Sequence, residues 1–469
     1  MDETTEKPKA GIVHLGLGAF FRAFGCIYVA DAMAASGGEW GIVGVSLRSA
    51  DVRDSLRPRN WAYTAVTMAP EGETMRDIEV LTEVLVAPED PAAVLRAMAD
   101  PAVKIVSLTV TEKGYCHDPA TGAVNFEHPD IVHDLAHPMP VSAPGYILRA
   151  LQMRHAAGEP PFTVLSCDNL PDNGALVRDV ILGMAQRLDP ALADWIAAHA
   201  RFPATMVDRI TPATTPSDIT RISAALGFAE AAPVLHEPFC QWVVEDDFVG
   251  NARPDLAAAG AQMVADVSAH EHMKLRMLNG AHSALAYLGY LGGHDTIAQT
   301  VADPVYATYL RQLWSEVLPA VTPPAGVDLN TYADALFERF ANPAIQHKTW
   351  QIAMDGSQKL PQRLLHTLAV NMEAGRPSTM ILLAVAGWMR YAAGRDEAGG
   401  VIDVRDPMAE RFTDIATTHQ TPAEMVAGFL ALQEVFSPEL AKALRTPITN
   451  IAQHLWAKGA RATMQEMQP

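Results

Sequence analysis

The first half of the chain alternates short apolar runs with longer amphipathic stretches. Each apolar run is bounded by glycine or polar residues, as buried strands are, and the stretches between them have helical periodicity. The earliest elements form a βαβ unit, with a strand at 11–15, a helix at 20–35 and a strand at 41–47. Later strands are expected at 103–110 and 162–166, and later helices at 91–99, 146–157 and 174–188. This alternation predicts an α/β fold with a parallel, doubly wound, Rossmann-like sheet.

The second half of the chain differs, because helical periodicity continues there with few strand signals. A helical stretch at 268–291 is followed by helices expected at 304–318, 329–341, 360–374, 379–393 and within 408–458. Extended segments are expected only at 400–404 and, between the halves, at 234–249, where an antiparallel pair is one option. We therefore predict a Rossmann-like dinucleotide-binding domain at 1–267 and an all-helical substrate and catalytic domain at 268–469.

Composition and charge narrow the class of protein. The chain has 469 residues, of which 49% are hydrophobic and 19% charged, as in globular enzymes with two cores. The formal net charge of −19 disfavours binding to nucleic acid or to an anionic membrane, since both need a basic face. An acidic small substrate remains compatible, because a local cationic pocket can override the overall sign.

The cysteines and the first residues bear on the compartment. The four cysteines include no CxxC pair and are too few for a disulfide framework, so we expect reduced thiols in a cytoplasmic protein. Residues 1–10 are polar and charged, unlike a signal peptide, and no uncharged apolar stretch reaches the about 18 residues of a membrane span. We expect a small-molecule substrate and a monomer or homodimer.

A glycine turn follows the first predicted strand. Gly16 and Gly18 stand where a Rossmann unit holds the pyrophosphate of a dinucleotide, since glycines allow close backbone approach and the next helix offers N–H donors. Phe21 replaces the third glycine of the usual fingerprint, so an ordinary tight turn is the alternative. Phe20 belongs to the same turn, and Arg22 is either a phosphate contact or a solvated surface arginine.

The end of the second predicted strand should select between NAD and NADP. An acidic residue there binds the ribose of NAD, whereas an arginine can bind the extra phosphate of NADP. Asp51 is the acidic candidate, although it stands slightly after the usual position in the sequence. Arg48 either binds the NADP phosphate or stacks on the adenine. These residues by themselves favour NAD only mildly.

A polar set lies on the helix predicted at 268–291. At about 100° per residue, Glu271, Lys274, Asn279 and His282 fall within an arc of roughly 140° on a partly buried face. Unpartnered polar groups are costly to bury, so the set is either a structural network or a dehydrogenase site. In the second case a desolvated lysine acts as a base and an amide stabilises a developing alkoxide.

Metal binding is not expected at this helix. His270 and His272 are two residues apart, so they do not face each other on a helix. His282 is ten residues further along, and no cysteine is near in the sequence. No ligand set with the usual zinc spacing is present, and we predict no metal.

Lys274, Asn279 and His282 also form a motif, Lys-x-x-x-x-Asn-x-x-His, which resembles the signature of the long-chain mannitol dehydrogenase family. Further blocks resemble that family in the same order, namely 108–115 (LTVTEKGY), 166–169 (SCDN), 202–209 (FPATMVDR), 237–246 (EPFCQWVVED) and 355–361 (DGSQKLP). The resemblance covers essentially the whole chain and is highly specific in combination.

This resemblance implies a Rossmann-like domain, a helical C-terminal domain and a substrate cleft between them. It implies zinc-independent hydride transfer with NAD, in which Lys274 is the base and Asn169 and Asn279 stabilise the alkoxide. His282 is implied as a further group at the substrate. The substrate-binding residues expected are Asp208, Lys359, Glu112 and Glu271, and further cofactor contacts are expected at Thr109 and Thr111.

Within the family, the blocks at 287–293 and 350–364 are most similar to the branch that interconverts D-fructuronate and D-mannonate. Polyol-oxidising members carry an arginine where Gln351 stands here. Phe24 stands where the family usually has a histidine. This difference calls into question a role for the side chain at that position, but not the cofactor. We expect a reductase for this uronate pair. A polyol or ketose dehydrogenase such as mannitol 2-dehydrogenase is one alternative, and a nucleotide sensor, which would not need Lys274, is another.

Overall fold

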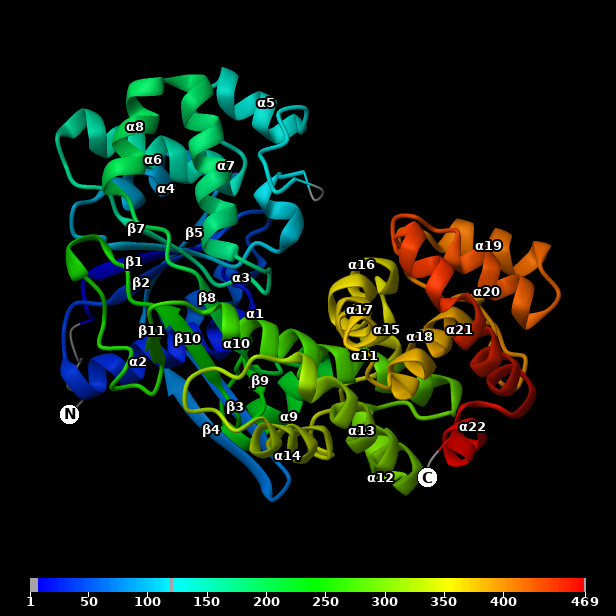
Figure 1. Ribbon diagram of the computed structural model, residues 1–469. Helices are drawn as coiled ribbons and strands as arrows, with labels where there is room; N and C mark the ends of the chain where they lie inside the picture. Colours follow the sequence, from blue (N-terminus) through cyan, green and yellow to red (C-terminus); the bar gives the residue numbers. More distant parts are fainter. Residues whose placement is uncertain (1–6, 119–120, 468–469) are drawn as a thin grey trace. The chain divides into compact units, whose positions relative to one another are not determined.

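The computed structural model describes residues 7–118 and 121–467 (Figure 1). The chain divides into two compact units between Ser268 and Ala269, one residue later than the sequence predicted. The N-terminal unit is built on a parallel sheet and the C-terminal unit is helical. The predicted class, an α/β Rossmann-like part followed by an all-α part, is therefore confirmed.

Parallel strands form the central sheet of the N-terminal unit: β1 (Ala10–Leu15), β2 (Gly41–Ser46), β5 (Leu81–Val86), β6 (Ile105–Leu108) and β7 (Thr163–Ser166). Their order across the sheet is β5-β2-β1-β6-β7. The winding direction therefore reverses between β1 and β6, which is the topological switch point at which Rossmann folds bind their ligands.

Helices cover both faces of this sheet, because side chains along each strand point alternately to one face and the other. Val13 and Leu15 pack into one hydrophobic core and Ile12 into another. The helices of this unit are α1 (Ala19–Ala23), α2 (Gly25–Ser36), α3 (Asp51–Leu56), α4 (Pro91–Ala99), α5 (Pro129–Ala136), α6 (Ala143–Ala157), α7 (Asn173–Leu188), α8 (Pro190–His199) and α9 (Pro216–Leu226), with short 3₁₀ turns η1 (Arg57–Arg59), η2 (Glu112–Tyr115) and η3 (Val249–Asn251). In Figure 1, α4, α6, α7 and α8 lie over the face opposite to α2.

The first predicted helix is in fact two helices. Phe24 has φ −132° and ψ −62°, which ends α1, and α2 begins at the next residue. Together, Ala19–Ser36 form the one described stretch that is long and apolar enough to cross a membrane by length and composition, and half of it is buried in this unit. It contains Arg22 and Asp31, so the sequence still has no uncharged stretch of that length.

Two smaller sheets complete the N-terminal unit. One contains an antiparallel hairpin of β3 (Tyr63–Ala69) and β4 (Gly72–Ile78), with β9 (Val234–His236) added in parallel. The other pairs β10 (Gln241–Glu245) with β8 (Thr205–Asp208) and β11 (Gln262–Val264). The extended segments expected at 234–249 are β9 and β10, which belong to different sheets; β10 is antiparallel to β8, whereas β9 is parallel to β3. The hairpin, β5, β8 and β11 were not predicted.

The C-terminal unit has one continuous hydrophobic core, which includes Tyr287, Trp388 and Leu455. The extended segment expected at 400–404 is reduced to an isolated bridge between Arg395 and Val401. The helical elements are α10 (Ser268–Met273), η4 (Lys274–Asn279), α11 (Gly280–Leu291), α12 (Ile297–Ala302), α13 (Pro304–Val317), η5 (Leu318–Ala320), α14 (Leu329–Phe340), α15 (Thr349–Ala353), α16 (Gly356–Leu360), η6 (Pro361–Leu365), α17 (His366–Glu373), α18 (Thr379–Ala392), α19 (Ala409–Thr418), α20 (Pro422–Leu430), α21 (Pro438–Lys458) and α22 (Ala460–Met467).

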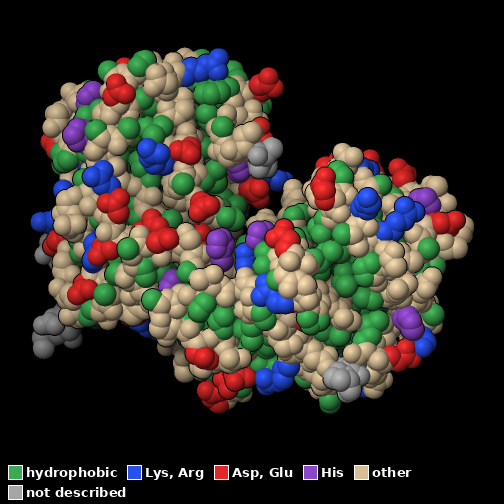
Figure 2. Space-filling model, viewed as in Figure 1, with side chains coloured by type: hydrophobic (Ala, Val, Ile, Leu, Met, Phe, Trp, Pro, Cys, Tyr) green, Lys and Arg blue, Asp and Glu red, His purple; other side chains and the backbone are tan. Residues whose placement is uncertain are grey.

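Charged side chains on the surface are of both signs. Figure 2 shows acidic and basic groups interspersed over the face in view. Elsewhere in the described protein, opposite charges also pair, as Arg311 does with Asp334 at 2.9 Å. On this face neither sign of charge is gathered into one large patch.

Candidate active site

Gly16 makes the turn after β1 possible. Its φ is +88°, a conformation that favours glycine, and a Cβ at this position would lie 2.2 Å from the Thr109 carbonyl oxygen. The N–H groups of Gly16 and Leu17 both donate to the Val45 carbonyl oxygen, at 2.9 and 3.1 Å. The ends of β1, β2 and β6 are therefore packed too tightly at this point for a side chain.

Gly18 differs from Gly16, because nothing in the described protein requires a glycine there. Its φ of −102° is open to any residue, and the one described atom within 4 Å of a Cβ would be the Gly16 carbonyl oxygen, at 3.8 Å. The missing side chain thus leaves free space at the start of α1, where a ligand can approach backbone N–H groups. This space favours the nucleotide interpretation over an ordinary tight turn.

A pocket of about 540 Å³ opens at this turn. Its volume is in the range of ligand pockets, and it lies at the carboxyl ends of β1, β2 and β6, next to the topological switch point. Phe20, Arg22 and Asp51 do not line it. The predicted cofactor residues that do line it are Gly16, Gly18, Arg48, Thr109 and Thr111.

The structure turns Arg22 toward the interior of the N-terminal unit. The side chain is 6% exposed, Nη1 donates to the Ala232 carbonyl oxygen at 2.6 Å, and the guanidinium lies 5.2 Å from the centre of the Tyr63 ring. Burial lowers the pKa of Arg22. This orientation fits neither the predicted phosphate contact nor a solvated arginine. Phe20 packs its ring against Phe24.

Both candidate selectors for the nucleotide are exposed. Arg48 is part of the pocket lining, and Asp51 is the first residue of α3. Ser49, also in the lining, donates from Oγ to the Asp51 carboxylate at 2.8 Å. Arg48 therefore reaches the pocket directly, whereas Asp51 is connected to it through Ser49.

A buried histidine, which the sequence reasoning missed, supports the glycine turn. His14 on β1 lies 2.8 Å from Ser107 Oγ through Nδ1 and 3.0 Å from Thr109 Oγ1 through Nε2. Thr109 Oγ1 in turn donates to the Gly16 carbonyl oxygen at 3.0 Å. Burial lowers the pKa of His14 to about 3, so the ring is neutral. Because Thr109 donates to Gly16, it accepts from His14, which places the ring proton on Nε2.

Asp168 is a second group that the sequence reasoning did not single out, although it lies in the block that contains Asn169. Its carboxylate accepts from the Val110 and Thr111 N–H groups, both at 2.9 Å, and from the Tyr115 hydroxyl at 2.8 Å. Burial raises its pKa. Thr111 has φ +63°, so these bonds hold the loop after β6 in a strained conformation beside the pocket.

The remaining predicted residues of the N-terminal unit lie at loops and strand ends. Asn169 follows β7, Asp208 is the buried last residue of β8, and Glu112 is exposed at the start of η2. Arg209, next to Asp208, donates to the backbone carbonyl oxygens of Ala23 and Phe239. These bonds already use much of the hydrogen-bonding capacity of its guanidinium, which makes Arg209 a poor candidate for binding a substrate carboxylate.

In the C-terminal unit, Lys274 and Asn279 lie on a π-helical turn. The helix predicted at 268–291 consists of α10, the π-helical segment η4 and α11. The Gly280 N–H group donates to the Leu275 carbonyl oxygen, a step of five residues. This wider turn brings residues five apart onto one side of the helix, closer than the about 140° between them in a regular α-helix. Lys274 and Asn279 are 7% and 8% exposed.

A second π-helical segment, η6, packs against η4. A Cβ at Gly280 would lie 2.8 Å from the Arg363 carbonyl oxygen, so glycine is needed for this close approach. The segments η4 and η6 are therefore neighbours, and η6 carries Arg363 and directly follows α16, which carries Lys359. Because π-helical turns are frequent at functional sites, two in contact mark this part of the unit as a candidate site.

His282 lies one helical turn beyond Asn279 and is buried. Its ring stacks on Phe340 with centroids 4.4 Å apart and meets the His347 ring edge-on at 5.1 Å. Burial, together with His347, Arg339 and Arg363, holds its pKa well below the usual value, so the ring is neutral. Its buried Nε2 has no hydrogen-bond partner among the described residues, which makes this atom a candidate for a hydrogen bond with a substrate hydroxyl.

Positive charge is concentrated around Lys359. Its Nζ donates to the carbonyl oxygens of Met354 and Ile352, at 2.5 and 3.3 Å. Burial and Arg363 lower the pKa of Lys359 to about 8, although Asp355 and Asp406 act in the opposite direction. Burial and Lys359 lower the pKa of His347 to about 4. Arg363 donates to Ser283 Oγ at 3.1 Å. This arrangement can receive an anion.

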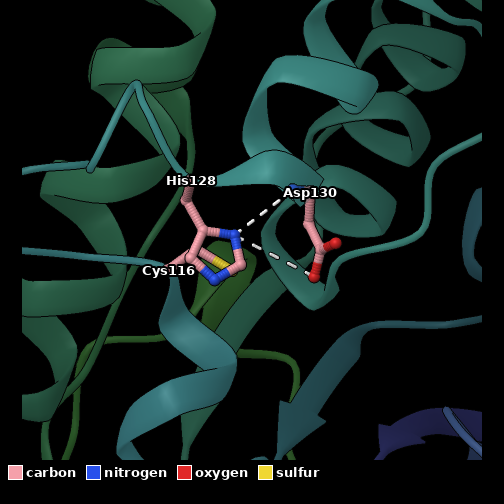
Figure 3. A group of neighbouring side chains, drawn as sticks. All are labelled: Cys116, His128 and Asp130. Carbon is pink, nitrogen blue, oxygen red and sulfur yellow. Dashed lines mark hydrogen bonds and ion pairs between the residues drawn. The ribbon is translucent and has the colours of Figure 1, made fainter.

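The described residues also contain a group of possible metal ligands that the spacing argument overlooked. Donor atoms of Cys116, His128 and Asp130 all lie within 4.8 Å of one another (Figure 3). The three residues line the nucleotide pocket. Eleven residues separate Cys116 from His128 in the sequence, so the two side chains come together only in the folded structure.

Comparisons with known proteins agree with the two-unit organisation. Residues 10–258 match the family described as the mannitol dehydrogenase Rossmann domain. Residues 266–456 match the family described as the mannitol dehydrogenase C-terminal domain. Together, the two matches cover most of the chain.

Two relatives from Escherichia coli K12 and one solved structure are similar over nearly their full lengths. D-mannonate oxidoreductase is 46% identical over 96% of this chain and 94% of its own. YeiQ, an uncharacterized oxidoreductase, is 47% identical over 92% of this chain and 88% of its own. Mannitol 2-dehydrogenase of Pseudomonas fluorescens, solved as a ternary complex with NAD and D-mannitol, is 37% identical in sequence and has a TM-score of 0.87. The match covers 98% of this chain and 94% of that chain.

Proposed function

Because this chain belongs to the mannitol dehydrogenase family, and is therefore an NAD-dependent dehydrogenase of secondary alcohols, we propose that it interconverts D-mannonate and D-fructuronate. The first compound is a hydroxy acid and the second is the corresponding keto acid. Each carries a carboxylate, which the neutral pair of mannitol and fructose lacks. The substrate pocket must therefore supply cationic or N–H partners for that group.

The positive charge around Lys359 is the observation that carries this proposal. Burial and the neighbouring Arg363 lower the pKa of Lys359 to about 8, so two cationic side chains lie close together in a buried part of the unit. A substrate carboxylate would form charge-assisted hydrogen bonds with Lys359 or Arg363. The relative named D-mannonate oxidoreductase, at 46% identity, supports the same substrate class.

The residues of the C-terminal unit would handle the proton. In oxidation, neutral Lys274 accepts the proton of the substrate hydroxyl, and in reduction protonated Lys274 returns it to the forming alkoxide. The amide of Asn279, on the same side of the π-helical turn, would stabilise negative charge on that oxygen, with Asn169 as its implied partner. The unpartnered Nε2 of His282 would orient a substrate hydroxyl.

The N-terminal unit would bind the nucleotide in the pocket at the glycine turn. The free space at Gly18 fits a pyrophosphate, whereas a side chain there would fill it. NAD, when bound, accepts the hydride from the carbon that carries the hydroxyl. The loop held by Asp168 and the turn held by His14 would fix the walls of this pocket.

A comparison of two ketone substrates tests the proposal. NADH-dependent reduction of D-fructuronate and D-fructose should be measured with the purified full-length protein. One charge-assisted hydrogen bond contributes roughly 1.5–3 kcal/mol, or about ten- to hundredfold in kcat/KM. We therefore expect D-fructuronate to exceed D-fructose by at least tenfold. Equal or better use of D-fructose would favour a mannitol 2-dehydrogenase instead.

A further inference from the structure

Three residues in the wall of the nucleotide pocket carry ligand atoms of the kinds that bind transition metals. Cys116 follows η2, His128 immediately precedes α5, and Asp130 is the second residue of α5. Figure 3 shows the His128 ring beside both the cysteine and the carboxylate. Their donor atoms lie within 4.8 Å of one another. A tetrahedral zinc ion would need these atoms about 3.4–3.7 Å apart, a distance that small side-chain rotations would reach.

The backbone holds these residues together without a metal. The Asn125 N–H group donates to the Cys116 carbonyl oxygen at 2.9 Å, and the His128 N–H group donates to the Asn125 carbonyl oxygen at 3.1 Å. An isolated bridge between His117 and Val124 fixes the same loop. Cys116 itself is held at φ +53°, a conformation that non-glycine residues adopt with strain.

The ligand types indicate which cation would bind. A thiol sulfur and an imidazole nitrogen select zinc and similar borderline cations over magnesium and calcium, which prefer oxygen ligands. His128 Nδ1 accepts from the Asp130 N–H group at 3.3 Å, which leaves Nε2 to bind a cation. The nearby Asp130 and Asp134 carboxylates would attract a cation.

We propose that Cys116, His128 and Asp130 bind one zinc-type divalent cation in the wall of the nucleotide pocket. The cation forms a bond to each of the three residues, and the thiol proton leaves to solvent as the sulfur–metal bond forms. Since all three residues line the pocket, a cation bound by them would lie in its wall. This cation is not part of the proposed hydride transfer.

Cobalt(II) is a suitable probe, because it binds in zinc sites and its absorption reports a thiolate ligand. The full-length protein, kept reduced and stripped of metal by a chelator, should be titrated with cobalt(II). We expect thiolate-to-cobalt absorption in the near ultraviolet that saturates at one equivalent and disappears when zinc is added. The Cys116→Ser variant should lose this absorption, and His128→Ala should weaken cobalt binding at least tenfold.

The Cys240→Ser variant is the matched control, because Cys240 is another free thiol of the same unit, half-buried and outside this group. It should keep the full cobalt signal, and circular dichroism should show that each variant is folded. If the wild type gives no thiolate absorption, or if Cys116→Ser keeps it, the proposed site is wrong. The proposed reductase activity is tested separately, since it should survive removal of metal.

Discussion

Lys274 and Asn279 are the first and last residues of one π-helical turn, so that two residues five apart share a side of the helix. A regular α-helix would separate them by about 140°. The widened turn thus places the proposed base and the proposed alkoxide-stabilising amide on one side of the helix.

Replacing Lys274 should remove turnover and leave nucleotide binding intact. Lys274→Ala deletes the group that transfers the proton. General acid–base catalysis typically accelerates a reaction by about 10²–10⁴-fold. We expect kcat to fall by at least a hundredfold, while the Kd for NADH, measured by fluorescence titration, is unchanged. Added primary amines should restore part of the rate.

The exposed Lys442 of α21 provides the control for this variant. Lys442→Ala should have wild-type kinetics. Near-normal turnover of Lys274→Ala would contradict the proposed role of Lys274 as the base.

The preference for a uronate should depend on pH through Lys359. Its pKa, lowered to about 8, means that the cation is lost as pH rises through that value, and the attraction for a carboxylate is lost with it. The ratio of kcat/KM for D-fructuronate to that for D-fructose should therefore fall above pH 8. Effects of pH on proton transfer itself affect both substrates and cancel in the ratio.

Lys359→Met keeps much of the side-chain volume and removes the charge. In this variant the ratio should be about ten- to hundredfold smaller at pH 7 and independent of pH. A wild-type ratio that stays constant from pH 6 to pH 9 would show that Lys359 does not contact the carboxylate.

The two glycines of the turn should respond differently to alanine. Gly16→Ala forces a Cβ to within 2.2 Å of a backbone oxygen at φ +88°, so we expect a loss of more than about 3 kcal/mol in unfolding free energy. Gly18→Ala meets open space in the protein and should cost at most about 1 kcal/mol as a helix N-cap.

Nucleotide binding distinguishes the two glycine variants further. Gly18→Ala should weaken NADH binding at least tenfold while its denaturation midpoint stays close to that of wild type. Unchanged NADH affinity in a folded Gly18→Ala protein would mean that the space at Gly18 does not hold the pyrophosphate.

NADH should be preferred over NADPH in kcat/KM. Asp51, through its hydrogen bond with Ser49, keeps negative charge at the rim of the pocket, which repels a 2′-phosphate. Arg48 in the lining acts in the opposite sense. Asp51→Asn should therefore narrow the preference, and Arg48→Ala should widen it. A clear preference of the wild type for NADPH would identify Arg48 as the selector.

The sequence by itself determined the features that depend on local pattern. Buried strands such as β1 and β2 appear as apolar runs, and the glycines after β1 mark the turn, because the restrictions on a strand and on a tight turn act on neighbouring residues. The alternation of strands and helices was enough for the Rossmann-like class, and the motif of Lys274, Asn279 and His282, combined with further blocks in family order, was enough for the family.

The tertiary structure decided what depends on contacts between distant residues. Arg22 turns inward because Ala232 and Tyr63, remote in sequence, offer it partners. Asp168 becomes important because it binds a loop more than fifty residues earlier, and Cys116 meets His128 only where the chain folds back. Helical periodicity also assumes about 100° per residue, so it could not reveal the π-helical turn that aligns Lys274 with Asn279. Such features arise from packing between elements, which no local pattern records.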